Sequence, residues 1–130
     1  MKKWLFIVIA LVLLLALSAT LGYALSRGDP AEKLSSVIAE GYLTSSPTFT
    51  FDGMADTLRL LETERLGCPY YWAFEFEFQC RHAGYGDRSG QALAQVITPH
   101  TARIVVQEGN VTEATIDDMW DMIEQEVITR

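Results

Sequence analysis

The stretch Trp72-Ala-Phe-Glu-Phe-Glu-Phe-Gln-Cys80 decides the fold, because large apolar side chains alternate in it with small or polar ones. A period of two is typical of a β-strand that packs one face on a core and leaves the other face in water. The apolar set consists of Trp72, Phe74, Phe76, Phe78 and Cys80. Because one strand cannot bury such a face alone, the stretch predicts an antiparallel sheet with an aromatic core.

Further strands are expected on both sides of this stretch. Asp52-Gly53 and Glu108-Gly109-Asn110 are turn signals between β-prone segments, and a loop with three glycines covers residues 81–91. If that loop is a hairpin centred near Gly86, Cys80 lies opposite Ala92 and His100 lies opposite Trp72. The strands expected beside the turns and the loop cover residues 48–51, 57–62, 92–98, 103–107 and 111–116.

Two helices are expected at the ends of the folded region. Asp29 can cap a helix over residues 30–41 that starts with Pro30 and stops at Gly41. Asp117 and Asp118 can cap a second one that carries Met119, Trp120, Ile123 and Val127 along one side. The predicted fold class is α+β: a curved antiparallel sheet of four to six strands, packed by one or two helices.

The N-terminal 25 residues differ from the rest of the chain. Residues 4–25 contain no charge and are long enough, at about 1.5 Å per residue, to cross a bilayer as a helix. We expect residues 1–25 to form a signal-anchor, with Lys2 and Lys3 keeping the N-terminus in the cytoplasm. Cleavage after Ala24 and secretion is the alternative. Either way, residues 26–130 are expected to form one small domain outside the cytoplasm, with the lipid bilayer as partner of residues 4–25.

The charge of this domain limits its partners. All 17 Asp and Glu follow residue 25, where only eight of the ten Lys and Arg lie, so residues 26–130 carry a net charge of −9. Nucleic acid is a poor partner for such a surface, because binding it needs clustered cations. A protein partner in the cell envelope fits better.

The two cysteines are not expected to form a bridge within the chain. Cys68 precedes the alternating strand and Cys80 ends it, so a continuous strand separates them by roughly 40 Å, whereas a disulfide needs its Cα atoms within about 7 Å. A broken strand would leave the bridge open as an alternative. Cys80 continues the aromatic face as a buried thiol, and Cys68, beside a proline, is the expected reactive thiol.

The chemistry-bearing residues give few signals. His82 and His100 would lie near opposite ends of the sheet, some 30 Å apart, so a shared zinc site is not expected. No catalytic residue, metal ion or cofactor is predicted from the spacing. The loop at 81–91 is the exception, because its composition exceeds what a hairpin needs. Two interpretations stay open there: a flexible hairpin loop whose Asp87 and Arg88 pair with each other, and a loop in which His82, Tyr85, Asp87 and Arg88 bind a ligand or partner.

Four strings together resemble a family of uncharacterised, membrane-anchored archaeal and bacterial proteins. They are Ser46-Pro-Thr-Phe-Thr-Phe-Asp-Gly53, Cys68-Pro-Tyr-Tyr-Trp72, His82-Ala-Gly-Tyr-Gly-Asp-Arg88 and Ile97-Thr-Pro-His100. The resemblance covers roughly residues 46–122 and implies no activity, because that family has no assigned function. Members often carry Cys-Pro-Tyr-Cys where this chain has Tyr71, so paired-thiol chemistry is not implied here.

The sequence therefore favours a non-enzymatic interaction module held at the cytoplasmic membrane by one helix. An enzyme or small-ligand protein that uses the loop at 81–91 is one alternative. A filament or envelope-assembly subunit, in which the apolar helix packs against its copies, is the other.

Overall fold

The computed structural model describes residues 1–25, 28–67 and 69–129, with side chains from residue 17 to residue 25 left out. The chain divides into two compact units, Met1–Pro30 and Ala31–Arg130. The first unit contains one helix, α1 (Lys2–Leu25), whose apolar side chains from Trp4 to Leu15 are largely exposed. Among the described residues, no helix combines the length and the apolar character that crossing a membrane requires. The transmembrane helix expected over residues 4–25 stays a prediction.

The second unit is α+β, as predicted. Its six strands follow one another in chain order in a single antiparallel sheet. The elements are α2 (Pro30–Ser45), α3 (Pro47–Asp52), β1 (Gly53–Gly67), β2 (Tyr71–Cys80), β3 (Thr98–Gln107), β4 (Asn110–Ile116), β5 (Trp120–Asp121) and β6 (Glu126–Val127).

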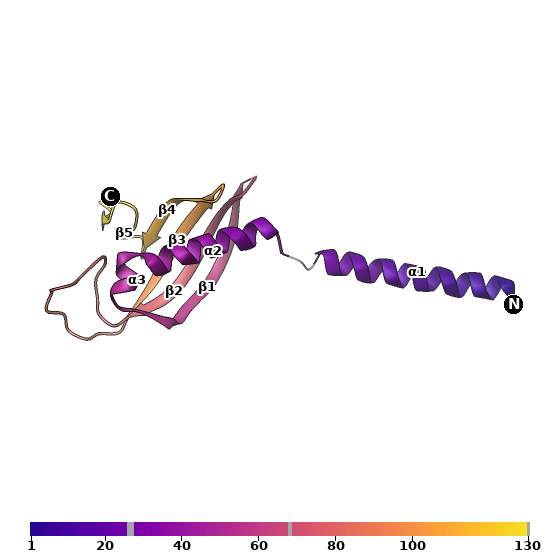
Figure 1. Cartoon of the computed structure of the whole chain (residues 1–130), viewed down its shortest axis with the longest axis horizontal. Helices are drawn as coiled ribbons and strands as arrows, with labels where there is room; N and C mark the ends of the chain where they lie inside the picture. The colour runs from indigo at the N-terminus through magenta and orange to yellow at the C-terminus, as the bar shows by residue number, and fades with distance from the viewer. Residues whose placement is uncertain (26–27, 68, 130) are drawn as a thin grey trace. The chain divides into compact units, whose positions relative to one another are not determined.

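Helix α2 lies across one face of this sheet, as Figure 1 shows, and covers the aromatic side of β2. The predicted alternation is confirmed, because Trp72, Phe74, Phe76, Phe78 and Cys80 are all at most 5% exposed. The core is completed by side chains of the other elements: Ala39, Leu43, Phe49, Ala102, Ile104, Val106, Ala114, Ile116 and Met122. The opposite face carries half-buried Glu75, Glu77 and Gln79.

The first predicted hairpin is wrong. Residues 48–51 form the helix α3, not a strand, because Ser46 caps the N–H of Phe49 with its side chain and Pro47 occupies the first turn. Residues 57–62 are part of the longer strand β1, which pairs with β2 and not with residues 48–51. Helix α2 also runs four residues past Gly41.

The predicted register between β2 and β3 is also wrong. Cys80 lies opposite Thr98 and Phe78 lies opposite His100. Of the strand expected over residues 92–98, only Thr98 is in a strand, and the others are part of a long connection, residues 81–97. The Glu108-Gly109-Asn110 turn between β3 and β4 is confirmed, with positive φ at Glu108 and Gly109.

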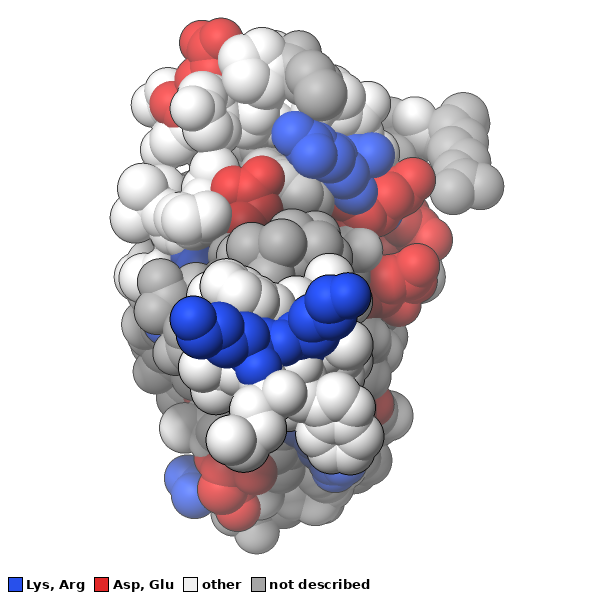
Figure 2. Space-filling view, turned by 90° about the vertical axis from the view of Figure 1, so that its right-hand side faces the viewer, with Lys and Arg blue, Asp and Glu red and all other residues white. Residues whose placement is uncertain are grey.

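The predicted C-terminal helix is wrong as well. Asp117 and Asp118 adopt φ values of 55° and 54°, in the left-handed region, where they cannot begin a helix. Turns and the two short strands β5 and β6 follow instead. On the face that Figure 2 shows, the acidic side chains lie in separate groups and not in one continuous patch.

Candidate functional site

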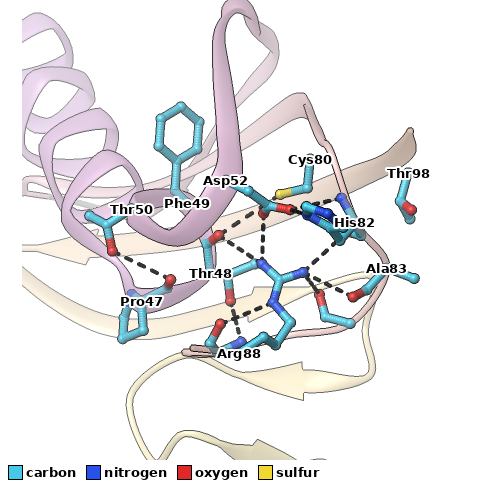
Figure 3. A network of polar contacts seen from close by, with 12 residues as sticks. Pro47, Thr48, Phe49, Thr50, Asp52, Cys80, His82, Ala83, Arg88 and Thr98 are labelled. Atoms are coloured by element: carbon cyan, nitrogen blue, oxygen red, sulfur yellow. Dashed lines mark hydrogen bonds and ion pairs between the residues drawn. The ribbon is translucent and has the colours of Figure 1, made fainter. Parts of the chain in front are cut away.

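The predicted binding loop meets helix α3 at one end of the sheet. Strand β2 ends at Cys80 and delivers residues 81–88 beside α3, which presents Thr48 and Asp52. Figure 3 shows the Arg88 side chain lying between the loop and the helix, with Asp52 and His82 on one side of it. These contacts join segments about 35 residues apart in the sequence, so the cluster fixes how the loop sits on the domain.

Arg88 is the centre of this cluster and is only 3% exposed. Its Nη2 donates to Asp52 Oδ1 at 2.8 Å and to the Thr48 carbonyl at 3.1 Å. Its Nη1 faces three carbonyl oxygens of the loop, and its Nε donates to a fourth at 3.3 Å. Those four carbonyls belong to His82, Ala83, Gly84 and Gly86. A guanidinium has five N–H groups, so its donors are all directed into the protein.

The glycines of the loop make this arrangement possible. Gly84 and Gly86 have φ values of 100° and 70°, which let the chain curl around the guanidinium with its carbonyls pointing inward. A Cβ atom at Gly84 would lie 3.2 Å from Cδ of Arg88. The Gly86 N–H also donates to Thr48 Oγ1 at 2.8 Å. The glycine-rich composition of the loop therefore allows it to surround the buried guanidinium of Arg88.

Asp52 balances the buried charge of Arg88. Its Oδ2 accepts from the backbone N–H of His82 at 2.7 Å and lies 2.8 Å from His82 Nδ1. Burial by itself would raise the pKa of Asp52, but hydrogen bonds from His82 and Cys80 and the charge of Arg88 outweigh it and lower the pKa. Asp52 is therefore ionised and forms a buried ion pair with Arg88.

Cys80 and Phe51 line the same cluster. The Cys80 thiol lies 3.8 Å from the Thr48 carbonyl, and burial together with the Asp52 charge raises the pKa of Cys80 to about 12. A thiol that stays protonated is a poor nucleophile. The Phe51 ring lies 4.7 Å from the Arg88 guanidinium carbon, which adds a cation–π contact.

Tyr85 belongs to a second cluster. Its hydroxyl donates to Asp117 Oδ2 at 2.9 Å, and its ring stacks on Trp120 with centroids 5.6 Å apart. Burial and the hydrogen bond to Asp117 raise the pKa of Tyr85 to about 12. Asp117 Oδ2 also lies 2.7 Å from Nδ1 of the buried His100, and its Oδ1 accepts from the Thr101 N–H. This cluster ties the loop to the C-terminal turns.

Asp87 is the one predicted loop residue of the four whose side chain faces solvent. Its carboxylate accepts from the backbone N–H of Ser89 at 2.9 Å and from the Ser89 hydroxyl, whose hydrogen bond lowers the pKa of Asp87. Asp87 and Ser89 border an open hollow of about 490 Å³, whose other walls come from Ser45 at the end of α2 and from α3. The expected pairing of Asp87 with Arg88 is replaced by the Asp52–Arg88 pair.

The sequence predicted the two histidines near opposite ends of the sheet, and this prediction is wrong. His100 lies opposite Phe78, two residues before the end of β2, and His82 lies two residues beyond that end. Each ring contacts its own carboxylate, Asp52 for His82 and Asp117 for His100. Within residues 1–25, 28–67 and 69–129, no group of three or more His, Cys, Asp or Glu is placed to hold a metal ion.

Sequence reasoning selected Arg88 and Tyr85 but missed their partners. Asp52 was interpreted as a turn residue and Asp117 as a helix cap, so neither carboxylate was placed beside the loop. The positions of these two carboxylates depend on helix α3 and on the register between β2 and β3. Neither of these two features was predicted correctly from the sequence. Cys68, the expected reactive thiol, lies outside the described residues, whereas Cys80 is free and buried.

Comparison of the chain with known proteins identifies no relative. No family model, no curated protein and no solved structure matches the chain.

Proposed function

We propose that the chain is a membrane-tethered, extracytoplasmic interaction module that catalyses no reaction of its own. One observation carries the proposal: the directional polar groups of Arg88 and Tyr85 are engaged inside the chain, while Val96 and Ile97, later in the same connection, are each 55% exposed. These internal contacts fix the earlier segment of the connection. Apolar side chains that are exposed later in the same connection are suited to contact with another protein.

The tether is supported by helix α1. It extends over 24 residues, begins with Lys2 and Lys3, and exposes its apolar side chains from Trp4 to Leu15. An apolar helix preceded by lysines is retained with those lysines on the cytoplasmic side. The domain after residue 27 then lies outside the cytoplasm, where an envelope protein can reach it.

Protease added to intact spheroplasts tests the topology. The domain should be digested while the membrane stays closed, because it faces outward. Full protection of the domain would refute the orientation, and a mature N-terminus near Leu25 would show cleavage instead of anchoring.

Crosslinking from intact membranes tests the interaction surface, with the full-length chain as bait. Val96→Asp/Ile97→Asp should lose a crosslinked partner that the natural chain captures, because a charge would be placed in an apolar contact. Asp87→Ala is the matched control in the same connection and should capture that partner undiminished. Equal capture by both variants would refute the assignment of this surface.

Binding of a small ligand is the second candidate, favoured by the hollow beside Asp87 and Ser89. Its other walls include Thr50 and Phe51 of α3, so it offers a carboxylate, hydroxyls and one aromatic ring. A ligand held there would be lost in Asp87→Ala, which is the reverse of the result expected for the interaction module.

A further inference from the structure

Strand β1 forms one edge of the sheet, as Figure 1 shows. It is 15 residues long, and in the described sheet it is hydrogen-bonded to β2 alone. The other side of such a strand presents unpaired N–H and C=O groups, to which a further strand can be added. At its middle, Leu60 and Leu61 are 46% and 52% exposed.

A β-bulge at this point changes which side chains share a face. Arg59 lies opposite Glu77 and Glu62 lies opposite Glu75, while Leu61 is skipped in the register. Because Glu75 and Glu77 both point away from the aromatic core, Arg59 and Glu62 lie on that same outward face, although they are three residues apart.

The charges on this face are not balanced within one chain. Arg59 pairs with Glu77 at 3.3 Å, an exposed contact of little energetic value. Glu62 faces Glu75 directly, and like charges opposite each other destabilise a strand pair. A cation brought alongside Glu62 would relieve this repulsion.

We propose that β1 pairs antiparallel with β1 of a second copy of this chain, about a two-fold axis between Leu60 and Leu61. Arg59 then lies opposite the partner's Glu62, and Glu62 lies opposite the partner's Arg59. The exposed Leu60 and Leu61 meet the same two leucines of the second copy. The two sheets become one, and the two bulges face each other at its centre.

Like charges disfavour several other registers of this pairing. Pairing centred on Thr63 would place Glu62 against the partner's Glu64, and pairing centred on either glutamate would place that residue against its own copy. Each of these alternatives brings like charges together across the new contact. The bulge and the charges thus limit indiscriminate pairing of the edge, and the proposed register is self-complementary in charge.

Charge reversal tests the pairing, with the full-length chain in detergent micelles and its protein mass measured by light scattering over a concentration series. The natural chain should be a dimer. Arg59→Glu and Glu62→Arg should each weaken dimerisation roughly tenfold or more, because two attractive contacts become repulsive. The double variant should dimerise again, because the complementary charges are restored with their positions exchanged.

Three controls separate this contact from other effects. Glu77→Gln removes only the partner of Arg59 within the chain and should stay dimeric. Glu113→Arg, an equal charge reversal at an exposed position of β4, should also stay dimeric. Arg59 and Glu62 are exposed, so circular dichroism should show all variants folded; if Arg59→Glu does not fold, Glu62→Arg and Leu61→Lys test the same contact.

A natural chain that is monomeric throughout, or single reversals that leave the dimer intact, would overturn the proposal, as would a double variant that stays monomeric. The inference goes beyond the proposed function and uses a separate readout. A monomer that still captures a partner through Val96 and Ile97 would refute the dimer and leave the interaction module standing.

Discussion

Replacing Arg88 by methionine is the sharpest test of the loop cluster. Arg88→Met keeps the aliphatic stem beside Gly84 but removes the guanidinium, so Asp52 stays buried without its cation. Carbonyl oxygens of the loop lose their donor at the same time. Breaking a buried ion pair from one side typically costs about 3–5 kcal/mol. Because both side chains are at most 5% exposed, solvent screening does not reduce this figure appreciably.

Urea unfolding of the full-length chain in detergent, followed by tryptophan fluorescence, measures the loss. A domain of this size has a free energy of unfolding of roughly 5–15 kcal/mol, so Arg88→Met should move the midpoint far toward low urea. Asp87→Ala, whose carboxylate is exposed, is the matched control and should stay within about 0.5 kcal/mol of the natural chain.

A double-mutant cycle with Asp52→Asn isolates the pair itself. The double variant should be more stable than the sum of the two single losses implies, by about 0.5–3 kcal/mol, because neither charge is then left buried alone. A loss below about 1 kcal/mol for Arg88→Met, or strict additivity in the cycle, would refute the claim that Arg88 holds the loop in place.

Further predictions concern the core and the titrating groups. Phe76→Ala should cost about 3–5 kcal/mol in urea unfolding, whereas Glu75→Ala, on the wet face, should be nearly neutral. Cys80 should resist iodoacetamide in the native protein at pH 8 and react once the protein is unfolded, as peptide mass spectrometry would show; rapid native labelling would contradict its burial. Because the folded-state pKa of Asp52 is lowered, its stabilisation should be complete above about pH 4 and be lost as pH falls through that lowered pKa, and Asp52→Asn should remove this part of the acid dependence. Tyr85 should ionise near pH 12 in an absorbance titration, and Tyr85→Phe should abolish that late step.

The sequence predicts the centre of the fold well because burial there repeats with a strict period. The alternation from Trp72 to Cys80 depends only on the two faces of a strand, and the structure buries all five apolar positions. The turn at Glu108-Gly109 was predictable for a local reason too, since the turn needs residues that tolerate positive φ.

The errors arise where local signals compete or where distant segments decide. At residues 48–51 the alternating Phe49 and Phe51 indicated a strand, but the cap at Ser46 and the proline at 47 favoured a helix more strongly. The register of β3 depends on where His100 and Thr98 pack against β2, which the turn composition at Gly86 does not reveal.

The candidate site was predicted in part for the same reasons. The composition of residues 81–91 correctly singled out Arg88 and Tyr85 as unusual, but it indicated a surface for a partner, whereas both side chains bind inside the chain. Asp52 and Asp117 carry no local signal for this role, because each meets the loop only through the tertiary fold.

Nitrogen NMR of the Arg88 guanidinium tests the central claim most directly, since that claim places its N–H groups inside the loop cluster. In the folded full-length chain the Nε–H and the two Nη groups should give separate signals that exchange slowly with water, because carbonyls and Asp52 hold them in fixed positions. Arg88→Lys should remove these signals and identify them. A single averaged signal with rapid exchange, as an exposed arginine gives, would contradict the account and return Arg88 to the surface as a binding residue.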